Sequence, residues 1–287
     1  MTDRDPLGAV IIAAHNESSV IARCLEALTP AIAAGRIQVL VVCNGCDDDT
    51  AHIARRFDGV EVLELEVASK TAALRAGDIA AIAGPRIYLD ADIELSASSA
   101  IAVLESLGRG PALAGRPPLR FDYSRASVLV RSWYRIRERL PSIADVLWGA
   151  GTYALSEKGR ARFSEFPEIV SDDLFIDSLF DDDEVVIVNT DPVVVRTPRT
   201  TSDLLKILVR TYRTQAEVAG AAPSGPVSTG QREQLRDIGR LLRQHPRYAA
   251  ASVVYIVLIA YARSKAKSTR SETSWERDDS SREETPR

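Results

Sequence analysis

From Ala9 to Asp90 the chain alternates between short apolar runs and segments with helical periodicity, and this alternation limits the folds available to it. The runs are rich in Val, Ile and Leu, which is typical of strands covered on both faces. Strands separated by helices are joined by right-handed crossovers and form a mostly parallel sheet. We therefore expect an α/β fold with strands over 9–14, 37–43, 60–65 and 86–90 and helices over 18–28, 50–57 and 70–83.

Polar residues follow three of the expected strands. Residues 15–17 come after the first strand, residues 44–50 follow the second, and Asp90 and Asp92 lie at the end of the fourth. The carboxyl ends of parallel strands meet at one edge of a sheet, where the ligands of such folds bind. We therefore expect these three segments to share one pocket.

Each segment also has a purely local explanation. Asn16 or Ser18 would cap the helix that follows, and Asn44 begins an Asn-Gly turn signal. An Asp-X-Asp triplet such as 90–92 is frequent by chance and occurs in solvated turns. Convergence of all three ends favours a binding site, because independent caps and turns need not gather at one edge.

The pair Asp90 and Asp92 has the chemistry of a divalent-cation site. Mg²⁺ and Mn²⁺ prefer carboxylate and phosphate oxygens, so two acids at a strand end can hold such an ion against a diphosphate. The chain has no Walker phosphate loop and no Gly-x-Gly-x-x-Gly turn after the first strand. This argues against a P-loop ATPase and against a dinucleotide oxidoreductase.

The order and spacing of these segments resemble the inverting family 2 glycosyltransferases of the GT-A fold, over about residues 9–180. The similar parts are an opening strand with an Asn-Glu turn, a second strand with an Asp-Gly-Ser-type turn, the lead into the third helix, a metal-binding signature, and an acceptor-side block that ends in an acid pair. They lie at 9–17, 41–50, 70–77, 89–92 and 148–174. The resemblance implies a GT-A fold with a mostly parallel central sheet, flanking helices and a C-terminal helical extension.

The resemblance also implies roles for individual residues. The residues that would contact the nucleotide sugar are Ala13, His15, Glu17, Asn44, Lys70, Asp90 and Ala91. The family commonly has Asp where this chain has Asn44. Asp92, together with Asp90, would bind Mg²⁺ or Mn²⁺. The donor or acceptor sugar would lie against Trp148, Gly149 and Gly151. Asp173 would be the general base that takes the proton from the acceptor hydroxyl, with Asp172 where the family usually has Glu.

Two of these groups have a local alternative. Gly149 and Gly151 suit a tight turn beside a packed Trp148 as well as they suit close approach of the backbone to a sugar. Asp172 and Asp173 could equally cap the amphipathic helix that follows them.

Composition narrows the class of protein and its compartment. There are 36 Lys and Arg against 40 Asp and Glu, and the formal net charge of -4 argues mildly against a nucleic-acid binder. Three cysteines, Cys24, Cys43 and Cys46, form no disulfide framework, which indicates a reducing compartment. The polar start has no secretory pattern. We expect a cytoplasmic protein, peripheral at the inner face of the plasma membrane.

The second half of the chain predicts a helical extension. We expect a GT-A catalytic domain over 1–200, a helical extension over 201–267 and a disordered charged tail over 268–287. The stretch 215–231 is rich in Ala, Gly, Pro and Ser, which is typical of a linker, and a helix is expected over 232–244. Arg196 and Arg199 are candidates for contact with a phosphate, or are simply solvated.

An apolar segment at 247–263 is followed by basic residues. As a helix, its apolar part would be about 22 Å long, shorter than the roughly 30 Å hydrocarbon core of a bilayer. A packed helix, an interfacial membrane helix and a short span all stay open, and the cations favour contact with anionic lipid.

The expected function is metal-dependent, inverting transfer of a sugar from a nucleoside-diphosphate sugar to a hydroxyl acceptor. The acceptor would be a glycan or a lipid-linked sugar in cell-surface polysaccharide or glycolipid assembly. The lack of a Gln-x-x-Arg-Trp motif after the acid pair favours a single transfer. The alternatives are a nucleotidyltransferase that makes a nucleotide sugar, which usually needs a Gly-rich basic loop that residues 15–17 lack, and a non-catalytic nucleotide-sugar-binding protein.

Overall fold

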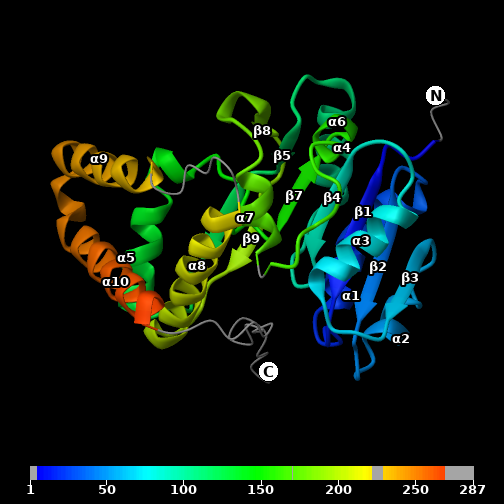
Figure 1. Ribbon diagram of the computed structural model, residues 1–287, viewed down its shortest axis with the longest axis horizontal. Coiled ribbons are helices and arrows are strands. Elements are labelled where there is room, and N and C mark those ends of the chain that lie inside the picture. The colour runs from blue at the N-terminus through cyan, green and yellow to red at the C-terminus, as the bar shows by residue number, and fades with distance from the viewer. Residues whose placement is uncertain (1–4, 170, 222–228, 269–287) are drawn as a thin grey trace. The chain divides into compact units, whose positions relative to one another are not determined.

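Figure 1 shows the chain as a computed structural model that describes residues 5–169, 171–221 and 229–268. The chain divides into two compact units, each made of residues that contact one another more than they contact the rest. The first unit contains residues 1–120, 147–168 and 179–195, and the second contains residues 121–146, 169–178 and 196–287. The first carries the alternating strands and helices, and the second is mainly helical.

The first unit is built on one seven-stranded sheet in the order β3-β2-β1-β4-β7-β5-β8. Strands β1 to β4 are parallel, β7 is antiparallel to both β4 and β5, and β8 is parallel to β5. The predicted mostly parallel sheet is therefore confirmed. The strands are β1 (Ala9–Ala14), β2 (Gln38–Asn44), β3 (Val60–Leu65), β4 (Arg86–Asp90), β5 (Ala114–Arg116), β7 (Thr152–Leu155) and β8 (Val185–Ile187).

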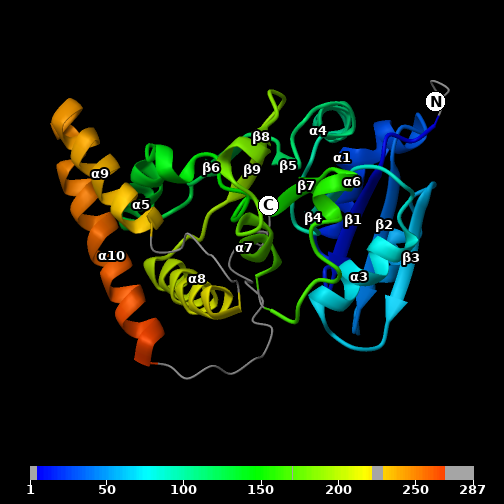
Figure 2. The ribbon, with the colours of Figure 1, turned by 45° about the horizontal axis from the view of Figure 1, so that its top comes forward.

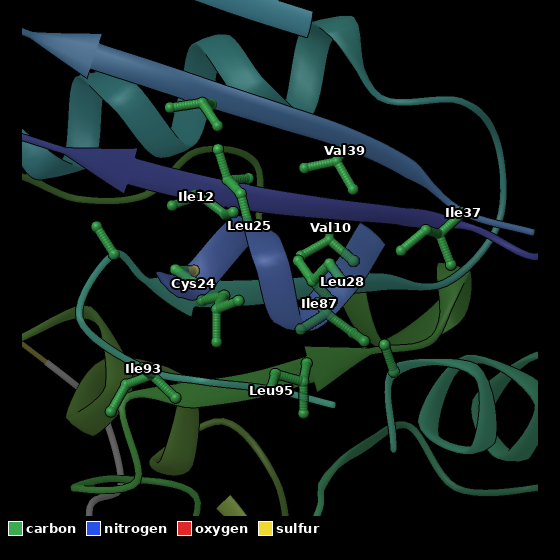
Figure 3. Close-up of a cluster of buried hydrophobic side chains, with 14 of the residues drawn as sticks. Val10, Ile12, Cys24, Leu25, Leu28, Ile37, Val39, Ile87, Ile93 and Leu95 are labelled. Carbon is green, nitrogen blue, oxygen red and sulfur yellow. The ribbon is translucent and has the colours of Figure 1, made fainter. Parts of the chain in front are cut away.

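Helices cover both faces of the sheet, which explains why β1 is an unbroken apolar run. Figure 3 shows the core on one face, where Val10 and Ile12 pack with residues of α1 (Ile21–Ala33) and α4 (Ala97–Arg109). Ile11 points to the opposite face, because successive side chains of a strand alternate. There it meets α3 (Lys70–Ala80). Every position of this strand therefore needs an apolar side chain.

Most predicted strand bounds match the structure, whereas two of the predicted helices end earlier than expected, and the first helix is displaced toward the C-terminus, from 18–28 to Ile21–Ala33. Three strands have the predicted bounds and the second is displaced by one residue. The helix expected over 50–57 ends at Ala54 as α2 (Thr50–Ala54), and the one expected over 70–83 ends at Ala80. Buried runs mark a strand well, but the last turn of a short helix has no such signal.

The predicted side-chain cap of the first helix is wrong. The helix α1 begins at Ile21 after Val20, which makes no capping side-chain bond. The backbone carbonyl of Glu17 accepts hydrogen bonds from the amides of Val20 and Ile21. A backbone turn therefore leads into this helix, and Ser18 is part of that turn.

The second unit packs its helices around α10 (Ala249–Ser268). This helix contacts α5 (Val128–Arg137) and α8 (Thr201–Ala221), and Trp133 stacks on Tyr255 with ring centres 5.4 Å apart. Figure 2 shows that α9 (Thr229–Gln244) precedes α10, and α9 contacts the short turn at Pro246–Tyr248 that joins the two helices. The remaining helices and strands are α6 (Glu157–Arg160), α7 (Asp172–Asp177), β6 (Leu119–Asp122) and β9 (Val193–Arg196), and β6 pairs with β9.

Two predictions about the helical extension need correction. The linker expected over 215–231 is wrong for the described residues, because 215–221 belong to α8 and 229–231 to α9. The apolar helix expected over 247–263 continues to Ser268, so its 20 residues extend about 30 Å. Residues 222–228 and the predicted disordered tail after Ser268 lie outside the described residues. The predicted domain boundary at residue 200 stays a prediction.

The segment Pro246–Ser268 is long and apolar enough to cross a membrane by length and composition. It is the one such helix among the residues described, and a helix packed in the core of a soluble protein satisfies the same criteria. Length alone therefore does not decide between these two environments.

Packing of α3 on the sheet makes Gly77 a test of the core. A Cβ atom added at Gly77 would lie 2.4 Å from Cγ2 of Ile11. We predict that Gly77→Ala lowers the free energy of unfolding by about 1–3 kcal/mol, measured by urea denaturation. Gly108→Ala in α4 is the matched control, because its Cβ would meet Pro85 at an ordinary 3.6 Å. An equal decrease in the free energy of unfolding in both variants would contradict the close packing of Gly77 on Ile11.

Candidate active site

Three strand ends lie side by side in the first unit. Strand β1 lies between β2 and β4, and its residue Ala13 pairs with Val42 on one side and with Asp90 on the other. Residues 15–17 and the segments that begin at Asn44 and Asp90 therefore leave the sheet at the same edge. The expected meeting of these three segments is confirmed.

Asn44 joins these segments through a fully buried side chain with 0% exposure. Its Nδ2 donates to the carbonyl oxygen of Ala14 at 2.8 Å, and its Oδ1 accepts from the backbone amide of Ser69 at 3.1 Å. An Asp here would place an acceptor against the Ala14 carbonyl, so the amide is the side chain that this arrangement requires. In this structure Asn44 is a scaffold residue, and direct contact with a nucleotide stays a prediction.

His15 lies on the same scaffold. Its Nδ1 is 2.7 Å from the backbone oxygen of Asn44. Because a carbonyl oxygen only accepts, Nδ1 carries the proton in this bond, and in the neutral ring Nε2 is then the acceptor. The hydrogen bond therefore fixes both the tautomer and the direction of the half-buried imidazole.

The turn after β1 is held by the loop after β2. Asn16 has a left-handed backbone with φ of 54°, and its Oδ1 accepts from the amide of Asp47 at 2.9 Å. The amide of Glu17 donates to Oγ1 of Thr50 at 2.7 Å, and the amide of Ser18 donates to Asp48 at 3.0 Å.

These bonds also affect the ionisation of Asp48. Partial burial alone would raise the pKa of the carboxyl group, but hydrogen bonds from Thr50 and Ser18 outweigh it and lower the pKa. The charged form of Asp48 therefore stabilises the turn, and that stabilisation is lost as the pH falls through its lowered pKa.

Asp90 is paired with a cation. Nζ of Lys70, the first residue of α3, lies 2.7 Å from Oδ1 of Asp90. The amide of Asp90 donates to the carbonyl oxygen of Gly151 at 2.8 Å, so the loop before β7 lies against the same carboxylate. The next residue, Ala91, is buried, and Asp92 is half-buried.

Glycine is required in that loop. Gly149 and Gly151 have φ of 77° and 64°, and a Cβ on Gly151 would lie 2.5 Å from Ile93 Cγ1 and 3.4 Å from Asp90 Oδ2. Left-handed backbone favours glycine, and the close approach to Asp90 excludes a side chain. The tight turn is therefore confirmed, with Trp148 half-buried at its start, and approach of this backbone to a sugar stays a prediction.

Four carboxylates influence one buried thiol. Burial raises the pKa of Cys24, and the charges of Asp92, Asp90, Glu94 and Glu17 raise it further, in that order. Opposing cations are Lys70 at Asp90 and Arg23, whose Nε lies 3.9 Å from Glu94. The edge of the sheet that carries Glu17 and Asp92 therefore has more carboxylates than cations around Cys24, which favours a bound cation.

The donor set suits a divalent ion that is shared with a ligand. Among the described residues no group of three His, Cys, Asp or Glu side chains is arranged to hold a metal by itself. Mg²⁺ is commonly bound by one or two carboxylates together with phosphate oxygens and water. Asp90 and Asp92 fit that smaller set.

Asp172 and Asp173 lie in the second unit, in the first turn of α7. Asp172 is buried, and Oδ1 of Asp173 accepts from the amide of Leu174 at 2.8 Å. The alternative that these acids cap the helix is wrong, because Ser171 is the N-cap residue and α7 has no capping side-chain bond. Asp173 is half-buried, and its catalytic role stays a prediction.

Several residues that build the site were missed by sequence reasoning. Thr50 and Ser69 hold the turns described above, and Ser69 also caps α3 by accepting from the amide of Ala72. A hydroxyl residue just before a helical segment is a recognised signal for a cap, so Ser69 was detectable. The bond from Glu17 to Thr50 spans 33 residues and has no local signal.

The family model described as glycosyl transferase family 2 matches residues 9–150, which include the three strand ends and the loop up to Ala150. The chain belongs to glycosyl transferase family 2. Membership of this family supports glycosyl transfer as its activity.

This family 2 glycosyltransferase has a short match to a curated relative. Over 68 residues it is 41% identical to "Glycosyltransferase AglE" of Haloferax volcanii, and the match covers 22% of each chain. The chain therefore matches about a fifth of the length of that relative. Such a segment supports the family and leaves substrates open.

Solved structures share the fold over most of the chain. The mannosyltransferase PcManGT from Pyrobaculum calidifontis, in complex with GDP-Man and Mn²⁺, has a TM-score of 0.63 and 14% identity, with 92% of this chain and 88% of that chain covered. Glucosyl-3-phosphoglycerate synthase from Mycobacterium tuberculosis, in complex with Mn²⁺, UDP and glucosyl-3-phosphoglycerate, has a TM-score of 0.54 and 18% identity over 76% and 81%. The GT-A fold is confirmed.

The scaffold role of Asn44 generates a prediction for this family 2 glycosyltransferase. We expect Asn44→Asp to lower the free energy of unfolding by about 3 kcal/mol at pH 7, because a buried carboxylate would face the Ala14 carbonyl. Burial would raise the pKa of the new acid, so the loss should shrink as the pH falls.

Asn16→Asp is the control, because a carboxylate there still accepts from the amide of Asp47. We expect a change below about 0.5 kcal/mol. Urea denaturation of both variants at two pH values measures the difference. A loss for Asn44→Asp that is small, or the same at both pH values, would show that the buried amide is dispensable.

Proposed function

We propose that this enzyme catalyses inverting transfer of a hexosyl group from a nucleoside-diphosphate sugar to a hydroxyl acceptor, with a divalent metal ion. The observation that carries the proposal is the meeting of three strand ends at one negative edge of the sheet, where Lys70 is paired with Asp90. Family membership supports glycosyl transfer. The two solved proteins of the same fold were crystallised with GDP-Man or UDP and Mn²⁺, which supports a nucleotide-linked hexose as donor.

The nucleotide would lie across the ends of β1, β2 and β4. In this proposal the base and ribose contact Ala13, His15, Glu17, Asn44 and Ala91. His15 offers an imidazole that is oriented by the backbone oxygen of Asn44. Lys70 lies beside Asp90 and would place its ammonium near the diphosphate, which it would attract as a point charge.

Asp92 and Asp90 would hold Mg²⁺ or Mn²⁺. When bound, the ion supplies Lewis-acid stabilisation of the charge on the departing diphosphate. Lys70 already neutralises part of the charge of Asp90, so Asp92 is the main protein ligand in this proposal. The remaining positions around the ion would be filled by phosphate oxygens and water.

Asp173 would take the proton from the acceptor hydroxyl as that oxygen attacks the anomeric carbon. The bond to the diphosphate breaks as the new glycosidic bond forms on the opposite side, so the anomeric centre is inverted. Asp172 lies next to this base in the first turn of α7. The donor or acceptor sugar would lie against Trp148, Gly149 and Gly151, whose backbone leaves room for it.

We infer that the acceptor is a glycan or a lipid-linked sugar used in cell-surface polysaccharide or glycolipid assembly. The enzyme would then work in the cytoplasm, at the inner face of the plasma membrane. The lack of a Gln-x-x-Arg-Trp motif supports a single transfer.

Donor binding and metal binding should depend on each other. We expect Mn²⁺ alone to change the melting temperature little, and Mn²⁺ with the correct UDP-, GDP- or dTDP-sugar to stabilise the protein by about 2.7 kcal/mol at a hundredfold excess over its Kd. Asp92→Asn should remove the effect of the metal, and Glu94→Gln should retain it. Stabilisation by Mn²⁺ without nucleotide, equal in both variants, would place the metal elsewhere.

The base assignment predicts a separate defect in turnover. Asp173→Asn should lower kcat by about two to four orders of magnitude and leave donor binding unchanged. Asp177→Asn at the other end of α7 is the matched control and should retain activity. Release of the nucleoside diphosphate measures turnover. Release of pyrophosphate from a sugar 1-phosphate and a nucleoside triphosphate would instead indicate a nucleotidyltransferase.

A further inference from the structure

Helix α10 has one packed face. Tyr255, Leu258, Ile259 and Ala262 are buried, and the helix contacts α5 and α8 of the same unit. Tyr255 stacks on Trp133, and burial raises the pKa of its hydroxyl group. Near the other end of the helix, the guanidinium of Arg263 lies 4.8 Å from the ring centre of Tyr212 in α8. These contacts hold α10 against α5 and α8.

The opposite face of α10 is apolar and exposed. Val253, Ile256, Val257 and Tyr261 are 60%, 42%, 57% and 54% exposed. Their spacing of three and four residues places them on one side of the helix. Exposing an apolar stripe of this kind to water costs free energy. Such a stripe on a surface helix therefore indicates a binding partner that covers it.

Cations lie at both ends of α10. Arg247 precedes the helix, and Lys265 and Lys267 lie in its last turn, all three exposed. Exposed cations on the adjoining α9 are Arg236, Arg240 and Arg243. The segment 229–268 contains eight Lys and Arg but two Asp and Glu.

The charge is divided unevenly along the chain. The second unit holds 22 of the 36 Lys and Arg and 16 of the 40 Asp and Glu, a formal charge of +6, which leaves -10 for the first unit. The apolar stripe of α10 therefore belongs to a basic unit of an acidic protein. A partner that covers it should be apolar within and negatively charged at its surface.

We propose that α10, with the arginines of α9, docks on the surface of an anionic lipid bilayer and lies in the plane of the membrane interface. The apolar stripe enters the boundary between headgroups and acyl chains, and the cations contact the lipid phosphates. The helix does not span the bilayer, because its packed face would have to leave α5 and α8 and expose Tyr255 and Arg263 to hydrocarbon. This surface is independent of the proposed sugar chemistry.

The test is co-sedimentation of the full chain with lipid vesicles, without donor or acceptor. Binding should be strong to vesicles of phosphatidylcholine with phosphatidylglycerol and weak to phosphatidylcholine alone. Ile256→Glu and Val257→Glu should each weaken binding by about tenfold or more. Lys265→Gln and Lys267→Gln should each weaken it by about fivefold, and NaCl at about 0.5 M should act in the same direction.

Ile79→Glu is the matched control, because Ile79 of α3 is 87% exposed and lies in the first unit. It should bind vesicles as the unsubstituted chain does, and all variants should retain their helical circular dichroism and melting temperature. Equal binding to neutral and anionic vesicles, or equal loss in Ile79→Glu, would overturn the proposal.

Two further outcomes would indicate a different partner for the apolar stripe or a different position of α10 in the bilayer. Sedimentation equilibrium that shows a dimer dissociated by Ile256→Glu would assign the apolar stripe to a second copy of the chain. Protein that stays with the vesicles after an alkaline carbonate wash would have α10 across the bilayer. Either result overturns docking in the plane of the interface. Failure of vesicle binding leaves the donor-binding experiments unaffected, so the two proposals fail separately.

Discussion

The candidate site depends on the buried amide of Asn44. One side chain joins the end of β1 through Ala14, the end of β2 through its own backbone and the start of α3 through Ser69. It also supplies the carbonyl oxygen that orients His15. A buried amide whose oxygen or nitrogen has no hydrogen-bond partner destabilises the folded state. The three segments that Asn44 joins are therefore expected to keep their positions together. The substitution of Asn for the usual acid thus has a structural reason, separate from the recognition of a base.

The strand order of the sheet brings charged residues that are distant in the sequence to one edge. Since β1 lies between β2 and β4, residues that are far apart in the chain leave neighbouring strands at the same level. Asp90, Asp92 and Glu17 then act on the same buried thiol of Cys24. Repulsion among these carboxylates is partly offset by Lys70, which α3 brings to Asp90 from its first residue. Packing of α3 on the sheet and the electrostatics of the site are therefore connected.

The central strands and the meeting of their ends were predictable from the sequence, because a strand covered on both faces leaves an unbroken apolar run and parallel strands share an edge. The turn after β1 was not predictable. Its amides pair with Thr50 and Asp48, about 30 residues away, and such pairing removes the need for the cap expected at Ser18. The length of α10 was underestimated for another reason, because residues 264–268 are polar yet helical. The functional meaning of Asp173 was suggested by resemblance alone, since its local pattern equally describes the start of a helix.

The pairing of Lys70 with Asp90 bears on how the proposed metal-dependent reaction would fit a site where no three described His, Cys, Asp or Glu side chains are arranged to hold an ion. A cation already lies 2.7 Å from one of the two carboxylates, so a divalent ion would find one full negative charge at Asp92 and a partly neutralised one at Asp90. Two such ligands bind an ion weakly by themselves, because Mg²⁺ and Mn²⁺ prefer six oxygen ligands in near-octahedral order. A diphosphate supplies both the missing oxygens and the missing charge. In the proposed mechanism the protein would supply part of the metal site and the donor the rest, so the ion would bind tightly only when the diphosphate leaving group is present.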